Sequence, residues 1–147
     1  MREILFRGKR FDNNEWVYGS YLDENNLGIF TDDTEYEDCN IAIVEVNTET
    51  IGQYTGLTDK NGKKIFEGDI LKYTRRNWLY SQSSKNATYF VAYLEMYYDD
   101  TCAAFKCRHY DENWKLIGGG FSPLNAEEII VEVIGNIYDN TELLNKE

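Results

Sequence analysis

The chain of 147 residues contains only one histidine, three cysteines and one proline. A single imidazole leaves little room for nucleophilic catalysis, because His109 would need Cys107 or a serine as nucleophile and a carboxylate such as Asp111 to orient it. No nucleophile-elbow motif presents such a residue. The scarcity of proline argues against a low-complexity or disordered chain. We therefore expect a globular protein that is not an enzyme.

The sequence also lacks the ligand spacing of a metal site and the pattern of a phosphate loop. Cys102, Cys107 and His109 come nearest to a metal cluster, but a spacing of five residues puts the two thiols on opposite faces of a strand, and there is no Cys-x-x-Cys pair. We expect small buried or half-buried thiols. No lysine or long helix follows the glycines at 118–120, which favours a hairpin or bulge over a phosphate cradle. The prediction is that the protein has no metal and no cofactor.

Two further absences concern location. No apolar run approaches the roughly 18 residues of a membrane-spanning helix, and the N-terminus does not resemble a signal peptide. An odd number of cysteines without a secretory signal is typical of a reducing compartment. These features predict a cytoplasmic protein with no membrane partner.

Basic residues are missing from a third of the chain. Residues 11–59 contain no Lys or Arg, within a formal net charge of −11. Twelve acids fall in this belt: Asp12, Glu15, Asp23, Glu24, Asp32, Asp33, Glu35, Glu37, Asp38, Glu45, Glu49 and Asp59. Such a belt could imitate nucleic acid and inhibit a host nucleic-acid-binding protein, or it could simply keep the protein soluble.

The next segment of the chain has the opposite charge, because residues 60–76 contain six basic residues and two acids. The run 72–80 adds aromatic rings to these cations, and its candidate contact residues are Lys72, Tyr73, Arg75, Arg76, Trp78 and Tyr80. Cations for phosphates and rings for bases are the components of a single-strand-binding surface. A solvated hairpin, or an arm that docks on the acidic belt of a second subunit, would explain the same residues.

Alternating apolar residues and turn formers predict strands throughout the chain. The central stretch is 50–73, where Asn61-Gly62 and Gly68 can supply the positive φ angles of tight turns. We expect strands near 3–7, 16–22, 27–31, 41–46, 70–73, 87–98, 101–110, 114–117 and 129–138. A further strand is expected to end at Thr55 and Gly56, and turn formers at 11–15 are expected to separate the first two strands. Polar segments at 32–40 and 74–86 are expected to be loops, and short helical turns are expected at 122–128 and 140–145. Phe90, Ala92, Leu94 and Met96 are assigned to one face of the longest strand.

The sequence resembles the YopX family of phage and prophage proteins. Three blocks carry the likeness: REILFRGKRFDNNEWVYG at 2–19, IGQYTGLTDKNGKKIFEGDILKY at 51–73 and VEVIGNIYDNTELL at 131–144. The resemblance implies a mainly β fold, a phage or prophage origin, a homo-oligomer and no established activity. The sequence departs from the family's expected pattern at 8–11, where a family member would read more like Ala-Trp-Asp.

Together these features predict one YopX-like domain over 1–147, with an N-terminal meander and acidic link in 1–46 and a barrel-like core in 47–147. The fold class is mainly β, either an antiparallel bent sheet or a small SH3-like barrel, with accessory helical turns. The expected function is a cytoplasmic phage or prophage accessory protein that acts by binding and self-assembly. The alternatives are a single-strand nucleic-acid-binding module and an acidic inhibitor of a host protein.

Overall fold

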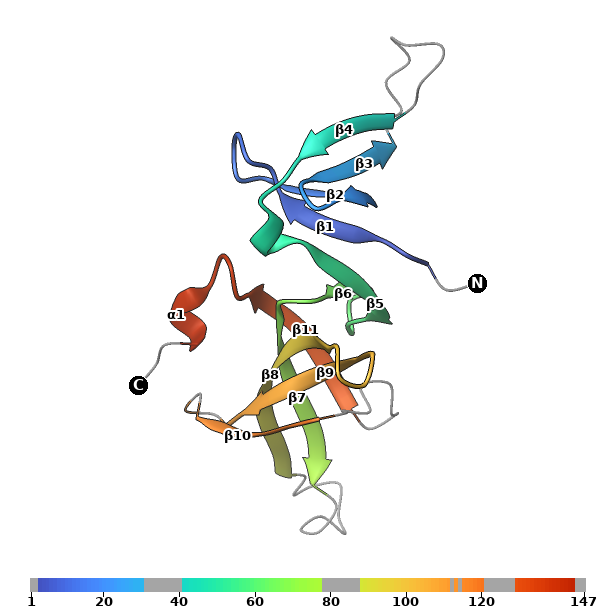
Figure 1. The fold of residues 1–147 in the computed structure, drawn as a ribbon. Coiled ribbons are helices and arrows are strands. Elements are labelled where there is room, and N and C mark those ends of the chain that lie inside the picture. The colour runs from blue at the N-terminus through green and yellow to red at the C-terminus, as the bar shows by residue number, and fades with distance from the viewer. Residues whose placement is uncertain are drawn as a thin grey trace. The chain divides into compact units, whose positions relative to one another are not determined.

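The computed structural model describes residues 3–30, 41–77, 88–111, 113, 115–120 and 129–144. Its strands form two antiparallel sheets, and the helical elements are short (Figure 1). The predicted mainly β class is therefore confirmed. The chain divides into two compact units, Met1–Gly56 and Leu57–Glu147, whereas the sequence placed the internal boundary at 46.

The first unit is an antiparallel meander. Its elements are β1 (Phe6–Lys9), β2 (Trp16–Asp23), β3 (Asn26–Phe30), β4 (Ile41–Glu45), the 3-10 turn η1 (Thr48–Thr50) and the first part of β5 (Gly52–Thr58). The strand order is β4-β3-β2-β1-β5. An isolated bridge joins Arg10 to Val46, so that the end of β4 meets the continuation of β1. Gly8 allows a close approach there, because a Cβ at this position would lie 3.0 Å from Val46 Cβ.

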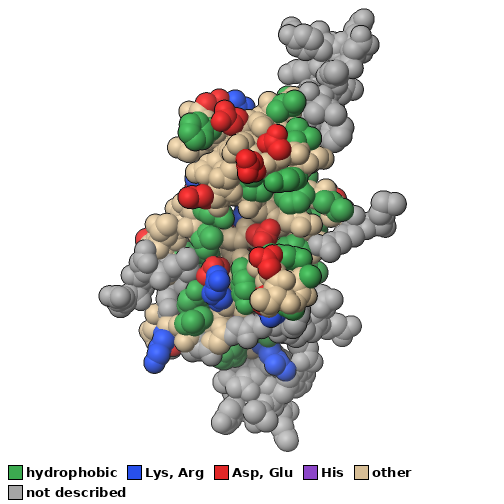
Figure 2. Space-filling view, viewed as in Figure 1, with side chains coloured by type: hydrophobic (Ala, Val, Ile, Leu, Met, Phe, Trp, Pro, Cys, Tyr) green, Lys and Arg blue, Asp and Glu red, His purple; other side chains and the backbone are tan. Residues whose placement is uncertain are grey.

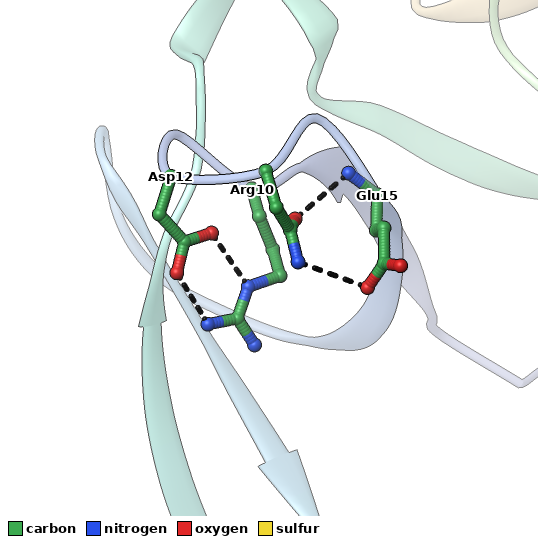
Figure 3. A network of polar contacts seen from close by, with 4 residues as sticks. Arg10, Asp12 and Glu15 are labelled. Atoms are coloured by element: carbon green, nitrogen blue, oxygen red, sulfur yellow. Dashed lines mark hydrogen bonds and ion pairs between the residues drawn. The ribbon is translucent and has the colours of Figure 1, made fainter.

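The reversal between β1 and β2 is built by its own polar side chains (Figure 3). The guanidinium of Arg10 donates two hydrogen bonds to the carboxylate of Asp12, at 2.9 and 2.7 Å. The amide of Asn13 accepts from the N–H of Glu15 and donates to its carboxylate, while Asn14 takes a positive φ of 60°. Asn tolerates this region better than most residues. The turn predicted from these residue types is thus observed.

The second unit contains a five-stranded sheet with the order β10-β9-β8-β7-β11. The elements of the second unit are β6 (Lys64–Phe66), β7 (Asp69–Asn77), β8 (Thr88–Asp99), β9 (Ala104–Tyr110), β10 (Leu116–Gly120), β11 (Ile129–Asn136) and α1 (Thr141–Leu144). The strand β8 is the central strand of this sheet. The turns at Gly62 and Gly68 have φ angles of 79° and 76°, as expected for these positions.

One hydrophobic core fills the second unit. Its buried members are Ile65, Leu71, Tyr73, Ala92, Leu94, Met96, Cys107 and Val131. The core residues of β7 and of β8 alternate along the strand, as the period of two requires, and β6, β9 and β11 contribute one residue each. Phe90 is an exception to the predicted face, because it lies beyond the end of this core and is 49% exposed.

The described strands form no closed barrel, because β10 and β11 remain the two ends of the second sheet. Other differences from the predicted elements are local. β5 continues past Gly56 to Thr58, and β9 begins only at Ala104, because residues 101–103 form a turn. The glycines at 118–120 belong to β10, with a bulge between Leu116 and Gly118. The loop prediction is wrong for residues 74–77, which extend β7 because they pair with β8. The predicted segments at 32–40, 78–86 and 122–128 lie outside the described residues.

Candidate binding surfaces

The edge strand β4 exposes an apolar side chain and unused peptide groups. The N–H of Val46 donates to the C=O of Asn25 at 2.8 Å. Because peptide groups alternate in direction along an antiparallel strand, the N–H and C=O of Ile43 point away from β3. No described residue bonds to them on that side, and the Ile43 side chain is 70% exposed. The sequence of β4, IAIVE, contains none of the lysines or prolines that commonly protect an edge.

The edge strand β11 is protected along its middle, whereas β4 is covered only at its end, where the C=O of Glu45 accepts from the N–H of Phe11 at 3.2 Å. The C=O of Val131 accepts a hydrogen bond from the N–H of Lys60 at 3.0 Å, and the N–H of Val133 donates to Asp59 Oδ2 at 3.1 Å. The ammonium of Lys60 also pairs with the carboxylate of Glu132 at 2.6 Å. The turn after β5 therefore occupies the outward peptide groups of this edge.

Asp59 is buried at this turn. Its second carboxylate oxygen accepts from the N–H groups of Asn61 and Lys63 at 2.8 and 2.9 Å. Burial by itself would raise the pKa of Asp59, but the N–H groups of Val133, Lys63 and Asn61 outweigh burial, so that the pKa lies below its usual value. The carboxylate holds the hairpin and the edge strand together in its charged form.

The predicted basic and aromatic run becomes one strand of a two-stranded arm, which we define as residues 72–77 of β7 and 88–93 of β8. Lys72 and Arg75 are exposed. Tyr73 is a correction to the predicted contact set, because it is only 8% exposed and packs in the core. The structure places the backbone of Arg76 in β7, and Trp78 and Tyr80 lie outside the described residues.

The exposed rings of the arm come from β8, which the sequence analysis did not assign to this site. Phe90 is paired with Arg75 across the two strands, and Tyr89 is paired with Arg76. Tyr89 is 60% exposed and Phe90 is 49% exposed. Directly opposite residues share one face of a sheet with Cβ atoms about 5 Å apart. The alternation of β7 alone does not reveal which residues of β8 lie opposite.

Several cations outside the arm are paired with carboxylates. Ion pairs join Arg10 to Asp12, Lys60 to Glu132, Lys106 to Asp99 and Arg108 to Glu95. Among the described residues, no ion pair joins Lys72 or Arg75 to an acid. Figure 2 shows red, blue and green side chains mixed over the visible surface. Residues 72–77 and 88–93 of the arm include cations and rings but no acid, although Glu132 of β11 is paired in register with Lys72.

A buried carboxylate lies on β8 beside the arm. Glu95 is 8% exposed; it accepts a hydrogen bond from the Tyr110 hydroxyl at 2.9 Å and pairs with Arg108. The guanidinium of Arg108 also lies 4.3 Å from the ring centre of Tyr97. Burial, with the adjacent Glu95 carboxylate, raises the pKa of Tyr110 to about 12. These contacts hold Glu95 of β8 to Tyr110 and Arg108 of the neighbouring strand β9.

The described residues contain no group of three or more side chains that could hold a metal ion. Cys102 is exposed in the turn before β9 rather than buried or half-buried. Cys107 is buried, and burial raises the pKa of its thiol to about 12. Burial also lowers the pKa of His109, whose Nε2 atom has no hydrogen-bond partner. None of the helices that the structure describes is long and apolar enough to cross a membrane.

Comparison with known proteins adds a family and a solved structure. The family model described as YopX protein matches residues 5–145. A crystal structure of protein EF1440 from Enterococcus faecalis is 27% identical, with a TM-score of 0.50, and the match covers 98% of this chain and 99% of that chain. Among curated proteins, no relative matches.

Proposed function

Because the chain belongs to the YopX family, we propose that it is a phage or prophage accessory protein that acts by binding and self-assembly, not by catalysis. Its proposed setting is the cytoplasm of the host, where its thiols stay reduced. The partner that we propose first is a second copy of the same chain, and the surface is the edge strand β4.

The contrast between the two edge strands supports this proposal. An exposed, apolar sheet edge is a template for pairing with another strand. The turn at Asp59 and Lys60 covers the edge of β11, whereas β4 presents the peptide groups and side chain of Ile43. Antiparallel pairing of β4 with its symmetry mate would use these groups in both copies and give a closed dimer.

Charge sets the salt dependence of such an assembly. The first unit has four basic residues against twelve acidic ones, so pairing two β4 strands brings like charges together. Screening by salt weakens this repulsion. We expect the dimer to persist or tighten between about 50 mM and about 500 mM salt, a range over which surface charges become screened. Docking of the basic arm on an acidic unit would show the opposite dependence.

The test is the solution mass, measured by light scattering coupled to size exclusion, for the wild type and Ile43→Lys. A lysine on β4 leaves its hydrogen bonds to β3 in place but puts a charge on the edge. We expect the wild type to exceed the monomer mass of 17.2 kDa and Ile43→Lys to shift toward it. Ile4→Lys is the matched control, because Ile4 is also an isoleucine and is 68% exposed.

Three outcomes would contradict the proposal. A wild-type monomer at all concentrations tested would exclude self-assembly. A multimer that Ile43→Lys leaves intact would place the interface elsewhere. A multimer that dissociates at high salt would indicate that the arm of one copy binds the acidic unit of another. Circular dichroism of each variant must match the wild type, so that a change in mass is not a loss of folding.

A further inference from the structure

We propose that the two-stranded arm, residues 72–77 and 88–93, binds single-stranded nucleic acid. This inference is independent of the β4 interface, because it uses another unit and another kind of contact. Phosphates would bind to Lys72 and Arg75, and bases would stack on Tyr89 and Phe90. The geometry places each of these side chains at the surface of one hairpin.

The charge of this segment is exceptional in the chain. No Asp or Glu occurs between Asp69 and Glu95, whereas this interval contains Lys72, Arg75, Arg76 and Lys85. A phosphate backbone is repelled by a protein of net charge −11 unless cations are grouped away from carboxylates. The arm contains such a group. Glu132 of β11 is paired in register with Lys72 but forms its ion pair with Lys60, and Arg75 is flanked by Ile129 and Phe90.

The rings of the arm are arranged for stacking and not for packing. Tyr73, Ala92 and Leu94 fill the core, but the residue pair at the next position, Arg75 and Phe90, lies beyond it. Phe90 and Tyr89 are neighbours on β8 and therefore point to opposite faces of the arm. Phe90 has the cation Arg75 directly across the pair, which combines a stacking surface with a phosphate contact.

These features favour single strands over duplexes and acidic proteins. Bases stacked within a duplex cannot reach the rings, whereas unpaired bases can stack on aromatic side chains. An acidic peptide would use Lys72 and Arg75 but would gain little from the π-faces of Phe90 and Tyr89. The ligand is therefore defined by both phosphates and exposed bases.

The test measures fluorescence anisotropy of labelled oligonucleotides of about 20 nucleotides, long enough to span a single-strand site. The probes are oligo-dT, oligo-U, a duplex and poly-glutamate, each titrated with the full chain at several salt concentrations. We expect both single strands to bind, the duplex to bind more weakly and poly-glutamate to bind least. The logarithm of the binding constant should fall linearly with the logarithm of the salt concentration.

Two sets of variants separate the roles of charge and stacking. Removing one cation, in Lys72→Ala or Arg75→Ala, should reduce the salt slope by about 0.7. Tyr89→Leu with Phe90→Leu keeps apolar area but removes the rings, and should weaken binding at least about fivefold while leaving the slope unchanged. Lys115→Ala and Tyr18→Leu are controls, because both residues are exposed outside the arm.

The proposal is overturned if no oligonucleotide binds at low salt. It is also overturned if poly-glutamate competes as well as oligo-dT, which would indicate an acidic protein partner, or if the ring variants bind like the wild type. The light-scattering mass of every variant is recorded in parallel. If the chain forms the multimer but binds no nucleic acid, only the proposal for the arm is refuted. If it binds nucleic acid but remains a monomer, only the proposal for the β4 interface is refuted.

Discussion

The carboxylate of Asp59 accepts a hydrogen bond from the backbone N–H of Val133 at 3.1 Å, across 74 positions of sequence. One aspartate therefore organises its own turn and also covers the edge of β11. A buried acceptor that serves several N–H groups is costly to remove, because each donor loses its partner.

We expect Asp59→Ala to destabilise the protein by about 2–4 kcal/mol, since it leaves three backbone N–H groups without their acceptor. Urea denaturation followed by circular dichroism gives the free energy of unfolding. Asp100→Ala is the control, because Asp100 is exposed in a turn and should change stability by less than about 0.5 kcal/mol. An equal loss in both variants would contradict the role assigned to Asp59.

The pH dependence of stability follows from the same carboxylate. The pKa of Asp59 is lower in the folded state than its ordinary value. A carboxyl of this kind stabilises the fold above the unfolded pKa of about 3.9, and the contribution is lost as pH falls through the folded pKa. We expect stability to decline below about pH 4 and to decline less steeply in Asp59→Asn. Melting temperatures of the wild type and Asp59→Asn from pH 7 down to pH 2.5 would check this. An equal fall in melting temperature in both proteins would contradict the role assigned to the Asp59 carboxylate.

Gly68 and Gly62 provide a matched pair of backbone tests. Both have a positive φ, but a Cβ on Gly68 would lie 2.9 Å from Tyr138 Cε2, whereas a Cβ on Gly62 would meet nothing within 4 Å. We expect Gly62→Ala to cost about 1 kcal/mol from backbone strain alone. Gly68→Ala should cost about 1–3 kcal/mol more, because the methyl group overpacks the contact with Tyr138. Similar losses at the two positions would show that this contact adjusts freely.

The two described cysteines should differ sharply in reactivity. Cys102 is exposed, whereas Cys107 is buried with a pKa raised to about 12. The thiolate is the reactive form, so we expect one thiol of a Cys39→Ser variant to react with Ellman's reagent at neutral pH. The second should react only after addition of denaturant. Cys102→Ser in the same background should abolish the fast reaction; rapid labelling of Cys107 would contradict its burial.

Several features could be predicted because they depend on neighbouring residues. The turn formers at 11–15, Asn61-Gly62 and Gly68 impose local backbone angles, and alternation of apolar residues identified most strands. The terminal helical turn was also found close to its predicted place, at Thr141–Leu144. The protection of β11 by Asp59 was not predicted, because it needs a contact between segments that are distant in sequence.

The candidate site on the arm was likewise predicted only in part from the sequence. The sequence identified Lys72 and Arg75 as exposed cations, but it also selected Tyr73, which the core buries. The rings that lie opposite the arginines, Tyr89 and Phe90, are determined by the register between β7 and β8.

The sequence by itself determined the family, the mainly β class, the turns and the segregation of charge, since these depend on local conformation and residue type. Only the tertiary structure decided which strand edges are covered and which face of each strand is buried. It also decided which rings accompany the cations of the arm. The physical reason is that strand register and sheet edges are fixed by hydrogen bonds and packing between distant segments, which no local pattern specifies.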